Sequence, residues 1–233
     1  TQGAPTLDLA ADRSAVVTVV RASDRWQVQS GRPGDRRCAI YGERTPASLH
    51  LAPNVESFDP MDRPRALASD GDSVLIATAD HIAWLGRQSE RPIWVDDPRD
   101  VALIQGAPTW IDVEGKVTRA SGNRTEVVVD DSGAAALASC DGAVCWTDYE
   151  AGVIRRRDRR GVTTVANGLS RPLGLASAPG VLFVATDDGL VAVEQDTRTI
   201  ERREGALSPL YVALKDDVLA WTEADGRVLV QVG

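Results

Sequence analysis

Residues 135–166 read AALASCDGAVCWTDYEAGVIRRRDRRGVTTVA. Four short runs rich in apolar and β-branched residues are separated here by turns that contain Asp-Gly, Glu-Ala-Gly and Arg-Arg-Gly. Short runs bounded by Gly and Asp are typical of antiparallel strands joined by tight turns. The stretch has no apolar stripe with the spacing of a helix. It therefore predicts four consecutive antiparallel strands.

The same pattern recurs along the chain. When the segments are aligned on Trp146, the matching positions are Ile76, Trp110, Trp146, Val184 and Trp221, at spacings of 34, 36, 38 and 37 residues. A nearly fixed period of this length marks a repeat architecture. Four short antiparallel strands per repeat are one blade of a β-propeller. We therefore expect an all-β fold, with residues 1–233 forming a single propeller domain.

The number of blades follows from the residues that the repeats leave over. Five repeats cover about residues 65–233, and the first 64 residues have to supply one more, which gives six blades. The last repeat stops after its third strand. We favour closure of the ring by the N-terminal strand Thr6–Ala10, which would complete that last blade. The first blade would then use Ala15–Val20, Arg25–Gln29, Arg37–Tyr41 and Ala47–Leu51, and residues 53–64 would be a connection. In the alternative register, residues 6–12 form the first inner strand and residues 45–64 are an excursion.

Composition narrows the classes of partner. The chain of 233 residues is 43% hydrophobic and 26% charged, and its formal net charge is -8. An acidic protein is a poor match for nucleic acid, whose phosphates require a basic face. No apolar run approaches the roughly 20 residues that span a bilayer. Nucleic-acid binding and a membrane span are therefore not expected.

The segment VCWTDYEAGVIRR, residues 144–156, resembles the six-bladed propellers of the Tyr-Trp-Thr-Asp and NHL-like families, in the TolB-like superfamily. Residues 145–148 stand where that family has Tyr-Trp-Thr-Asp. The segment AWTEADGRV, residues 220–228, is a looser match, and ANGLSRPLGLA, residues 166–176, resembles the link between blades. Propellers of this kind serve as extracellular binding domains, periplasmic scaffolds and metal-dependent lactonases. The resemblance implies a fold and leaves the function open.

Every aligned repeat has a carboxylate four residues after the Trp position, in the turn between its second and third strands. These residues are Asp80, Glu114, Glu150, Asp188 and Asp225. Repetition about an axis would place them around one face, which we call the top face, where they would attract a basic peptide or a cation. Asp and Glu also accept backbone N–H bonds in tight turns, so a local role is equally compatible.

A second polar column lies two residues after the Trp position. It contains Asp112, Asp148 and Glu223, with Thr78 and Thr186 in the remaining repeats. Strand alternation puts these side chains on the same side as the Trp. The resemblance implies a structural Asp that hydrogen-bonds to a neighbouring blade. The alternative is a ring of oxygen ligands for a divalent cation such as calcium in the central channel.

Six tryptophans supply most of the aromatic residues. Trp110, Trp146 and Trp221 are predicted to pack between blades. Trp84, Trp94 and Trp26 fall on later strands, where one of them would offer a contact surface to a ligand, since Trp is common at the centre of interfaces.

Residues for a hydrolytic site are scarce. The chain has two histidines, His50 and His81, and His81 follows Asp80 without a nucleophile-elbow motif. The lactonase-type propellers bind their metal partly through an Asn in a Pro-Asn-Gly segment, and Leu173 stands at that position here. We therefore favour a non-catalytic binding or scaffold module for a protein or peptide partner of basic character, and we assign no cofactor. A metal-dependent hydrolase or lyase of the lactonase type is the alternative, and a structural module of an envelope assembly is a third possibility.

Cys140 and Cys145 flank the Asp141–Gly142 turn of one predicted hairpin. A disulfide fits if the register brings their Cα atoms within about 7 Å. Such a bond would favour an oxidising, extracytoplasmic compartment, and Cys38 would be unpaired.

The basic run IRRRDRR, residues 154–160, is predicted to be a charged outer edge that discourages pairing between sheets. The alternative is a contact with an anionic surface or partner.

Overall fold

The computed structural model describes residues 6–11, 16–22, 25–31, 57–58, 65–69, 74–85, 91–130, 133–202, 206, 208–215, 218–224 and 228–232. Up to residue 58, the description is of strands and their pairing only.

All regular structure in these residues is strand. The strands before residue 100 are β1 (Thr6–Ala11), β2 (Val16–Ala22), β3 (Arg25–Gly31), β4 (Ser57–Phe58), β5 (Ala66–Ser69), β6 (Val74–Ala77), β7 (His81–Leu85) and β8 (Ile93–Trp94). The next eight are β9 (Asp100–Ile104), β10 (Ala107–Ile111), β11 (Val117–Ser121), β12 (Arg124–Val129), β13 (Ala134–Cys140), β14 (Ala143–Asp148), β15 (Val153–Asp158) and β16 (Gly161–Ala166). The last seven are β17 (Gly174–Ala178), β18 (Val181–Thr186), β19 (Gly189–Glu194), β20 (Ile200–Arg202), β21 (Pro209–Lys215), β22 (Val218–Glu223) and β23 (Val228–Val232).

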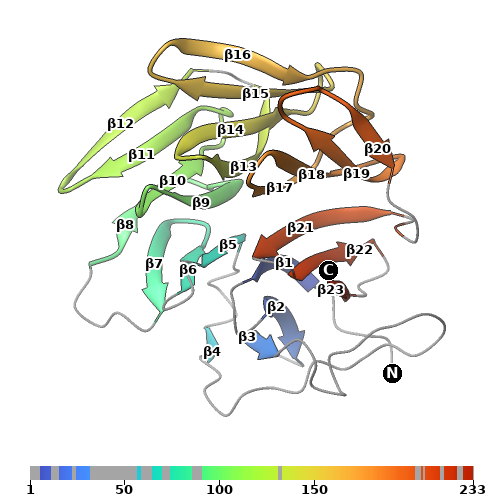
Figure 1. Cartoon of the computed structure of the whole chain (residues 1–233). Coiled ribbons are helices and arrows are strands. Elements are labelled where there is room, and N and C mark those ends of the chain that lie inside the picture. Colours follow the sequence, from blue (N-terminus) through green and yellow to red (C-terminus); the bar gives the residue numbers. More distant parts are fainter. Residues whose placement is uncertain are drawn as a thin grey trace.

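The described strands form antiparallel sheets in sequence order, namely β1–β4, β5–β8, β9–β12, β13–β16, β17–β20 and the three-stranded β21–β23. Four of them, from β5–β8 to β17–β20, have four strands and side chains that are described over most of their length. These four match the predicted repeat unit. Figure 1 shows the sheets around a common centre, with the first strand of each sheet innermost. The number of blades in the complete ring stays a prediction.

The favoured closure by the N-terminal strand is wrong. β1 pairs with β2 in a sheet of its own, with Ala11 opposite Val16, while the β21–β23 sheet has three described strands. β1 instead packs beside β5 on one side and beside β21 on the other, as an innermost strand. A hairpin with a short connection closes at little entropic cost, whereas pairing with β23 would join the two ends of the chain. The first inner strand is therefore the one that the alternative register gave.

The first sheet also differs from prediction at its outer strand. Its fourth strand is Ser57–Phe58, within residues 53–64 that were expected to be a connection. The strands expected at Arg37–Tyr41 and Ala47–Leu51, together with Cys38 and His50, lie outside the described residues.

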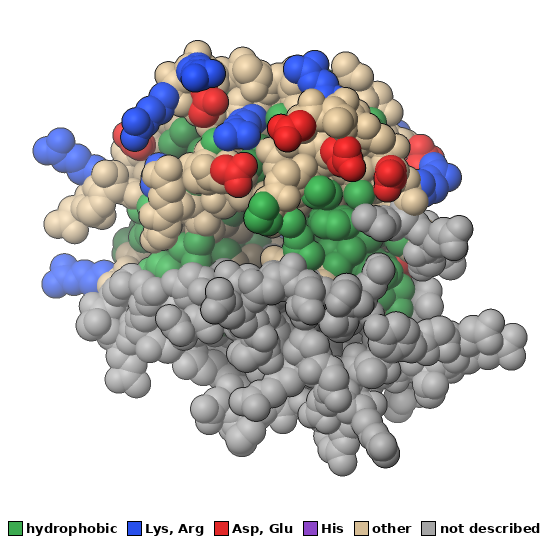
Figure 2. All heavy atoms as spheres, viewed as in Figure 1, with side chains coloured by type: hydrophobic (Ala, Val, Ile, Leu, Met, Phe, Trp, Pro, Cys, Tyr) green, Lys and Arg blue, Asp and Glu red, His purple; other side chains and the backbone are tan. Residues whose placement is uncertain are grey.

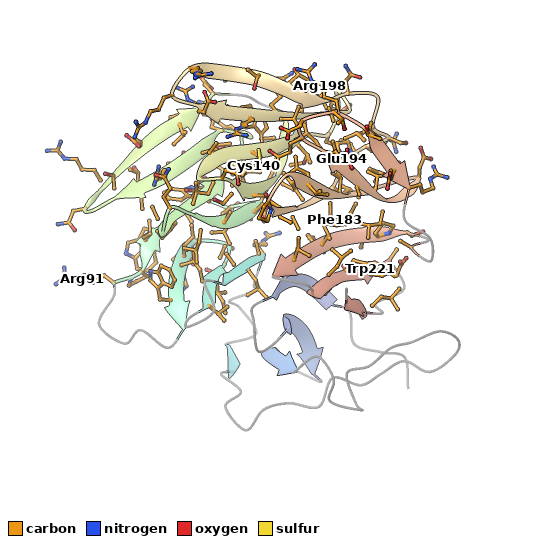
Figure 3. The ribbon with its side chains drawn as sticks, in the orientation of Figure 1. Arg91, Cys140, Phe183, Glu194, Arg198 and Trp221 are labelled. Carbon is orange, nitrogen blue, oxygen red and sulfur yellow. A yellow bond between two sulfur atoms is a disulfide. The ribbon has the colours of Figure 1, made fainter. Side chains whose placement is uncertain are left out.

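The aligned Trp positions lie on the second strand of each sheet, as predicted. Ile76, Trp146 and Val184 are fully buried, and Trp110 and Trp221 are nearly so. Trp146 packs with Leu137 and with residues of the preceding sheet, such as Ile104 and Val117. Trp221 packs in the same way against Ala176 and Leu190, and Figure 3 labels it on β22, below Phe183 on β18. The core is thus a series of apolar layers between neighbouring sheets, and a repeated large residue fills each layer.

The β13–β14 hairpin has the geometry that its sequence predicts. Asp141 and Gly142 have φ values of 50° and 77°, the left-handed conformations that a two-residue hairpin turn requires. The register places Cys140 opposite Ala143 and Cys145 opposite Ala138, so the two cysteines are diagonal neighbours. They form a disulfide with a Cα–Cα distance of 5.9 Å, and both are buried.

Thiol labelling tests this disulfide. In the unfolded protein before reduction, we expect one reactive thiol, that of Cys38, and after reduction we expect three. Three reactive thiols before reduction would show that Cys140 and Cys145 are not bonded to each other.

The basic run lies on β15 and its turn to β16. Arg157, Arg159 and Arg160 are exposed, which agrees with a charged outer edge. Figure 2 shows basic and acidic side chains interspersed over the β13–β16 and β17–β20 sheets. Within the described part of the chain, no helix has the length and apolar character needed to cross a membrane.

Candidate functional site

One face of the described sheets is built from two kinds of connection. The link between β16 and β17 hydrogen-bonds, in both sheets that it joins, to the turn between the second and third strands. Leu169 N donates to Gly152 O of the first sheet, and Asp187 N of the second sheet donates to Ser170 O of the link. The link before β9 does the same, since Asp97 N donates to Ala79 O and Arg99 N donates to Ile111 O. The turns between second and third strands therefore gather on one face with the links, and this is the top face.

Four of the five predicted carboxylates lie on this top face. Asp80, Glu114, Glu150 and Asp188 each occupy the turn between a second and a third strand, and all four are exposed. Asp225 lies outside the described residues. The alignment thus predicted their common position, and their role in binding stays a prediction.

Two of these carboxylates have a cationic neighbour, and a third, Asp80, has the His81 imidazole beside it. The shortest atom distances are 2.7 Å from Asp80 Oδ1 to His81 Nδ1, 2.7 Å from Glu114 Oε2 to Lys116 Nζ, and 3.9 Å from Asp188 Oδ2 to Arg202 Nη2. The Lys116 ammonium lowers the pKa of Glu114, and Glu114 raises the pKa of Lys116 in return. Exposed pairs of this kind add little stability, but they reduce the net negative field of the face. No ion pair to Glu150 occurs among the described residues.

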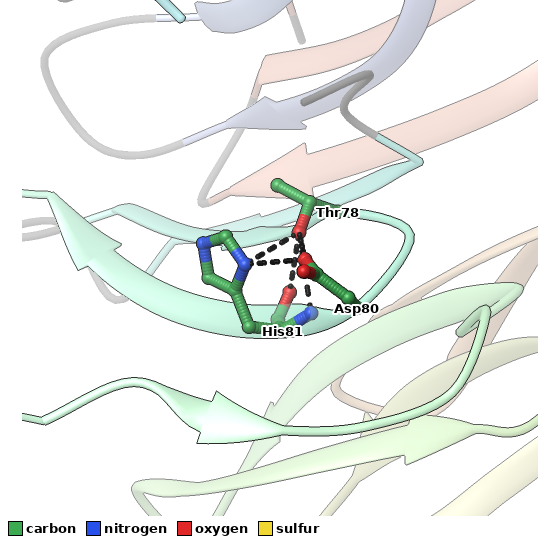
Figure 4. Close-up of polar contacts among 3 residues, drawn as sticks. All are labelled: Thr78, Asp80 and His81. Carbon is green, nitrogen blue, oxygen red and sulfur yellow. Dashed lines mark hydrogen bonds and ion pairs between the residues drawn. The ribbon is translucent and has the colours of Figure 1, made fainter. Parts of the chain in front are cut away.

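Asp80 and His81 belong to a compact hydrogen-bond network in the turn after β6 (Figure 4). The Thr78 hydroxyl lies 3.1 Å from Asp80 Oδ1 and 2.9 Å from His81 Nδ1. The hydrogen bond from His81 lowers the pKa of Asp80, and the Thr78 hydroxyl acts in the same direction. Both partners use the same imidazole nitrogen, whereas a nucleophile and an orienting acid would use opposite nitrogens. The network therefore stabilises the turn and does not have the geometry of a catalytic triad.

Trp94 gives this corner of the top face an exposed aromatic surface. It pairs with His81 across β7 and β8, and the two ring centroids are 5.7 Å apart at an interplanar angle of 60°. The Trp94 residue is 73% exposed, the highest value among the large hydrophobic residues described. Trp84, the other predicted contact, is half-buried against the core between β5–β8 and β9–β12. The side chain of Trp26 on β3 is outside the description.

The second polar column is structural. Asp148 is buried, accepts a hydrogen bond from Ala151 N at 2.9 Å and pairs with Arg155 at 3.0 Å. Glu223 is also buried and accepts hydrogen bonds from Ser208 N at 2.6 Å and from Trp221 Nε1 at 2.9 Å.

The partners given above lie in the residue's own sheet or in the link that enters it, whereas the resemblance implied a hydrogen bond to a neighbouring blade. Within the described residues, no three His, Cys, Asp or Glu side chains come together as a metal site.

The contact between neighbouring sheets is made instead by Asp100, a residue that the sequence analysis missed. It begins the inner strand β9 at the top face, opposite Ile111. Its Oδ2 accepts a hydrogen bond of 2.6 Å from Leu137 N of the next sheet, and its Oδ1 accepts one from Val101 N. Burial raises the pKa of Asp100 to about 7, although both backbone donors act in the opposite direction. Its sequence signal is a contrast between repeats: where Asp100 stands, three other sheets have the small residues Ala66, Ala136 and Gly174.

Comparison with solved structures identifies the architecture. A streptogramin B lyase has a TM-score of 0.69 at 11% identity, over 100% of this chain and 95% of its own. A gluconolactonase from Xanthomonas campestris has a TM-score of 0.70 at 13% identity, over 100% of this chain and 87% of its own. A structure of a nidogen/laminin complex matches at a TM-score of 0.64 and 16% identity, over 92% of this chain and 88% of its own.

The fold is a β-propeller. At these identities the likeness concerns the fold alone, and it includes both enzymes and a protein–protein complex. No family model matches the sequence, and no curated protein matches it. The function of this propeller has to be argued from its own residues.

Proposed function

We propose that residues 1–233 form one six-bladed β-propeller domain, a non-catalytic binding or scaffold module whose top face binds a protein or peptide partner. The six-blade count is supported by the inner strands, because β1 packs beside both β5 and β21. The single observation that carries the binding proposal is the exposed indole of Trp94 on the same face as the repeated carboxylates.

Trp94 has the properties of an interface anchor. Its backbone is fixed by pairing with β7, and its ring is held against His81, so little side-chain freedom would be lost on binding. Val113 is also apolar and exposed, and it lies in the turn between β10 and β11 of the next sheet. Arg99 Nη2 donates to the Val113 carbonyl oxygen at 2.6 Å. An apolar anchor with charged residues around it is the usual composition of a protein-binding surface.

The charges favour a partner of basic character. Glu150 is exposed and makes no ion pair among the described residues. Glu114 and Asp188 keep exposed carboxylates beside single cations, and Asp80 is exposed beside His81. Asp225 would continue this set in the last repeat. A basic peptide would then be drawn to the top face before Trp94 makes close contact.

A fluorescein-labelled octalysine peptide tests this proposal by stopped-flow anisotropy. We expect the association rate constant to fall on the order of tenfold from low to physiological salt, since salt screens steering charges. The variant Glu114→Gln/Glu150→Gln/Asp188→Asn should associate more slowly at low salt, at unchanged thermal stability.

The matched control removes three exposed carboxylates away from the top face, by Glu126→Gln, Asp196→Asn and Glu201→Gln. The control should keep the association rate of the original protein. Equal slowing in both triple variants would mean that net charge, and not the top face, attracts the peptide.

A metal-dependent hydrolase or lyase is the second candidate. Asp100 favours it, because a carboxylate with a pKa near 7 at the top end of an inner strand is suited to proton transfer. Leu173, where lactonase-type propellers have a metal-binding Asn, opposes it. Calorimetric titration with calcium and manganese distinguishes the candidates, since heat that disappears in Asp100→Asn would support the enzyme.

We also propose an extracytoplasmic location. The Cys140–Cys145 disulfide supports it, because such bonds persist in oxidising compartments.

A further inference from the structure

Arg156 and Gln195 meet between the β13–β16 and β17–β20 sheets. Arg156 lies on the same side of β15 as Ile154, which packs with Leu182 and Val184 of the next sheet. Gln195 directly follows β19, and Arg156 Nη1 lies 3.4 Å from its Oε1. The two side chains therefore lie together at the opposite end of the sheets from the top face.

These two residues leave hydrogen-bond donors without acceptors. Arg156 Nε and Gln195 Nε2 are buried, and neither has a hydrogen-bond partner within the described part of the chain. Both atoms carry N–H groups, so the group that would satisfy them is an acceptor. Because the guanidinium is always charged, an anionic acceptor is favoured over a neutral one.

Arg119 and Arg65 each have a partner for the charged end of the guanidinium. Arg119 Nη2 donates to Ile104 O at 3.0 Å, and Arg65 Nη2 lies 2.6 Å from Asp97 Oδ1. Arg65 Nε also lacks a hydrogen bond, but its guanidinium charge is paired. Of these three arginines, only Arg156 has both an unpartnered Nε and no carboxylate partner among the described residues.

The surrounding turns add exposed cations to this position. Arg159 and Arg160 form the turn from β15 to β16, and Arg198 lies in the turn from β19 to β20. All three are exposed and make no ion pair within the described residues. Three carboxylates lie nearby: Asp158 Oδ1 accepts from Arg160 N, Glu194 Oε2 accepts from Thr197 Oγ1, and Asp196 is exposed in the turn that holds Arg198. With Arg156, the four arginines outnumber these three carboxylates. Figure 3 labels Glu194 and Arg198 over the β17–β20 sheet.

We propose that an acidic polypeptide segment binds at this end of the β13–β16 and β17–β20 sheets. One of its carboxylates would accept hydrogen bonds from Arg156 Nε and Gln195 Nε2. Neighbouring carboxylates of the segment would pair with Arg159, Arg160 and Arg198. This second surface goes beyond the proposed function, because it lies at the opposite face and takes a partner of opposite charge.

The position of the donors favours a peptide over a flat anionic surface. The two donor atoms are buried between the sheets, so a partner group has to insert between the turns to reach them. A projecting carboxylate side chain is better suited to this than the headgroup layer of a membrane, which would meet the exposed turn arginines first. The acidic residues dispersed over the same sheets in Figure 2 would also oppose a uniformly negative surface.

The test uses a fluorescein-labelled hexaglutamate peptide and equilibrium anisotropy with the whole chain at low salt. We expect saturable binding, and we expect Gln195→Glu to weaken it about tenfold or more. That substitution supplies a carboxylate beside Arg156 within the protein, so it should also raise the melting temperature. Arg156→Gln should weaken binding similarly by removing the cation.

Arg124→Gln is the matched control, because it removes one exposed positive charge from the start of β12 without touching the buried donors. It should change affinity less than about twofold, as expected for a single screened surface charge. The proposal is overturned if the peptide does not bind, if Gln195→Glu binds as well as the original protein, or if Arg124→Gln weakens binding equally. Displacement of the peptide by inorganic phosphate at matched ionic strength would also overturn it, in favour of a general anion site.

Discussion

Replacing Trp146 with alanine is expected to lower the free energy of unfolding by about 3–5 kcal/mol. The indole is fully buried and packs with Leu137 of its own sheet and with Ile104 and Val117 of the preceding sheet. Alanine would leave a cavity in an apolar layer that two sheets share, and neither sheet can close it without losing pairing with its other neighbours. Urea denaturation followed by circular dichroism measures this loss.

Trp94→Ala is the control for this substitution, because it removes the same side chain from a position that is 73% exposed. We expect a change within about 0.5 kcal/mol, as for most surface substitutions. Similar losses for the two variants would contradict the assignment of Trp146 to a buried layer between sheets.

Asp100 is expected to make stability depend on pH in the opposite direction from an ordinary paired carboxylate. Burial raises its pKa to about 7 in the folded protein, from the ordinary value of 3.8 for an Asp side chain. Between these values the folded state binds more protons than the unfolded state, so stability falls as the pH rises through this window and levels off above it. At about 1.4 kcal/mol per pKa unit, the loss is up to about 4 kcal/mol.

The variant Asp100→Asn cannot ionise and should lose this component. The free energy of unfolding of both proteins, measured from pH 4 to pH 8, gives a difference that isolates Asp100 from the other carboxylates. Asp188→Asn, at an exposed position of the same face, serves as the control. A stability difference between Asp100→Asn and the original protein that does not change with pH would contradict the raised pKa.

Repetition made much of this fold predictable from the sequence. Trp110, Trp146 and Trp221 have the same environment in successive sheets, so a local pattern of strands and turns was enough to place them. The same repetition placed Glu114 and Glu150 in equivalent turns. Sequence could not show that Asp188 has a cation beside it, because Arg202 reaches it from a different strand.

The errors arose where the chain departs from its own repeat. Because the last repeat lacks a fourth strand, we predicted that the N-terminal strand would supply it. The N-terminal strand pairs instead with Val16–Ala22, the strand that follows it directly in the sequence. Asp100 was overlooked because it occurs once, where the other repeats have small residues. The orphaned donors of Arg156 and Gln195 come from residues 39 positions apart in sequence, and only the packing of two sheets brings them together.

The location of β1 has a consequence for how such a chain can change in evolution. Each sheet is drawn from one uninterrupted stretch of sequence, and no described strand is shared between two sheets. A genetic duplication or loss of one whole repeat would therefore leave every hydrogen-bonded ladder in the other repeats intact. Only the apolar layers between sheets would have to adjust to the altered curvature. The irregular spacing of the Trp positions, 34 to 38 residues, is compatible with repeats that have been gained as units and have diverged since.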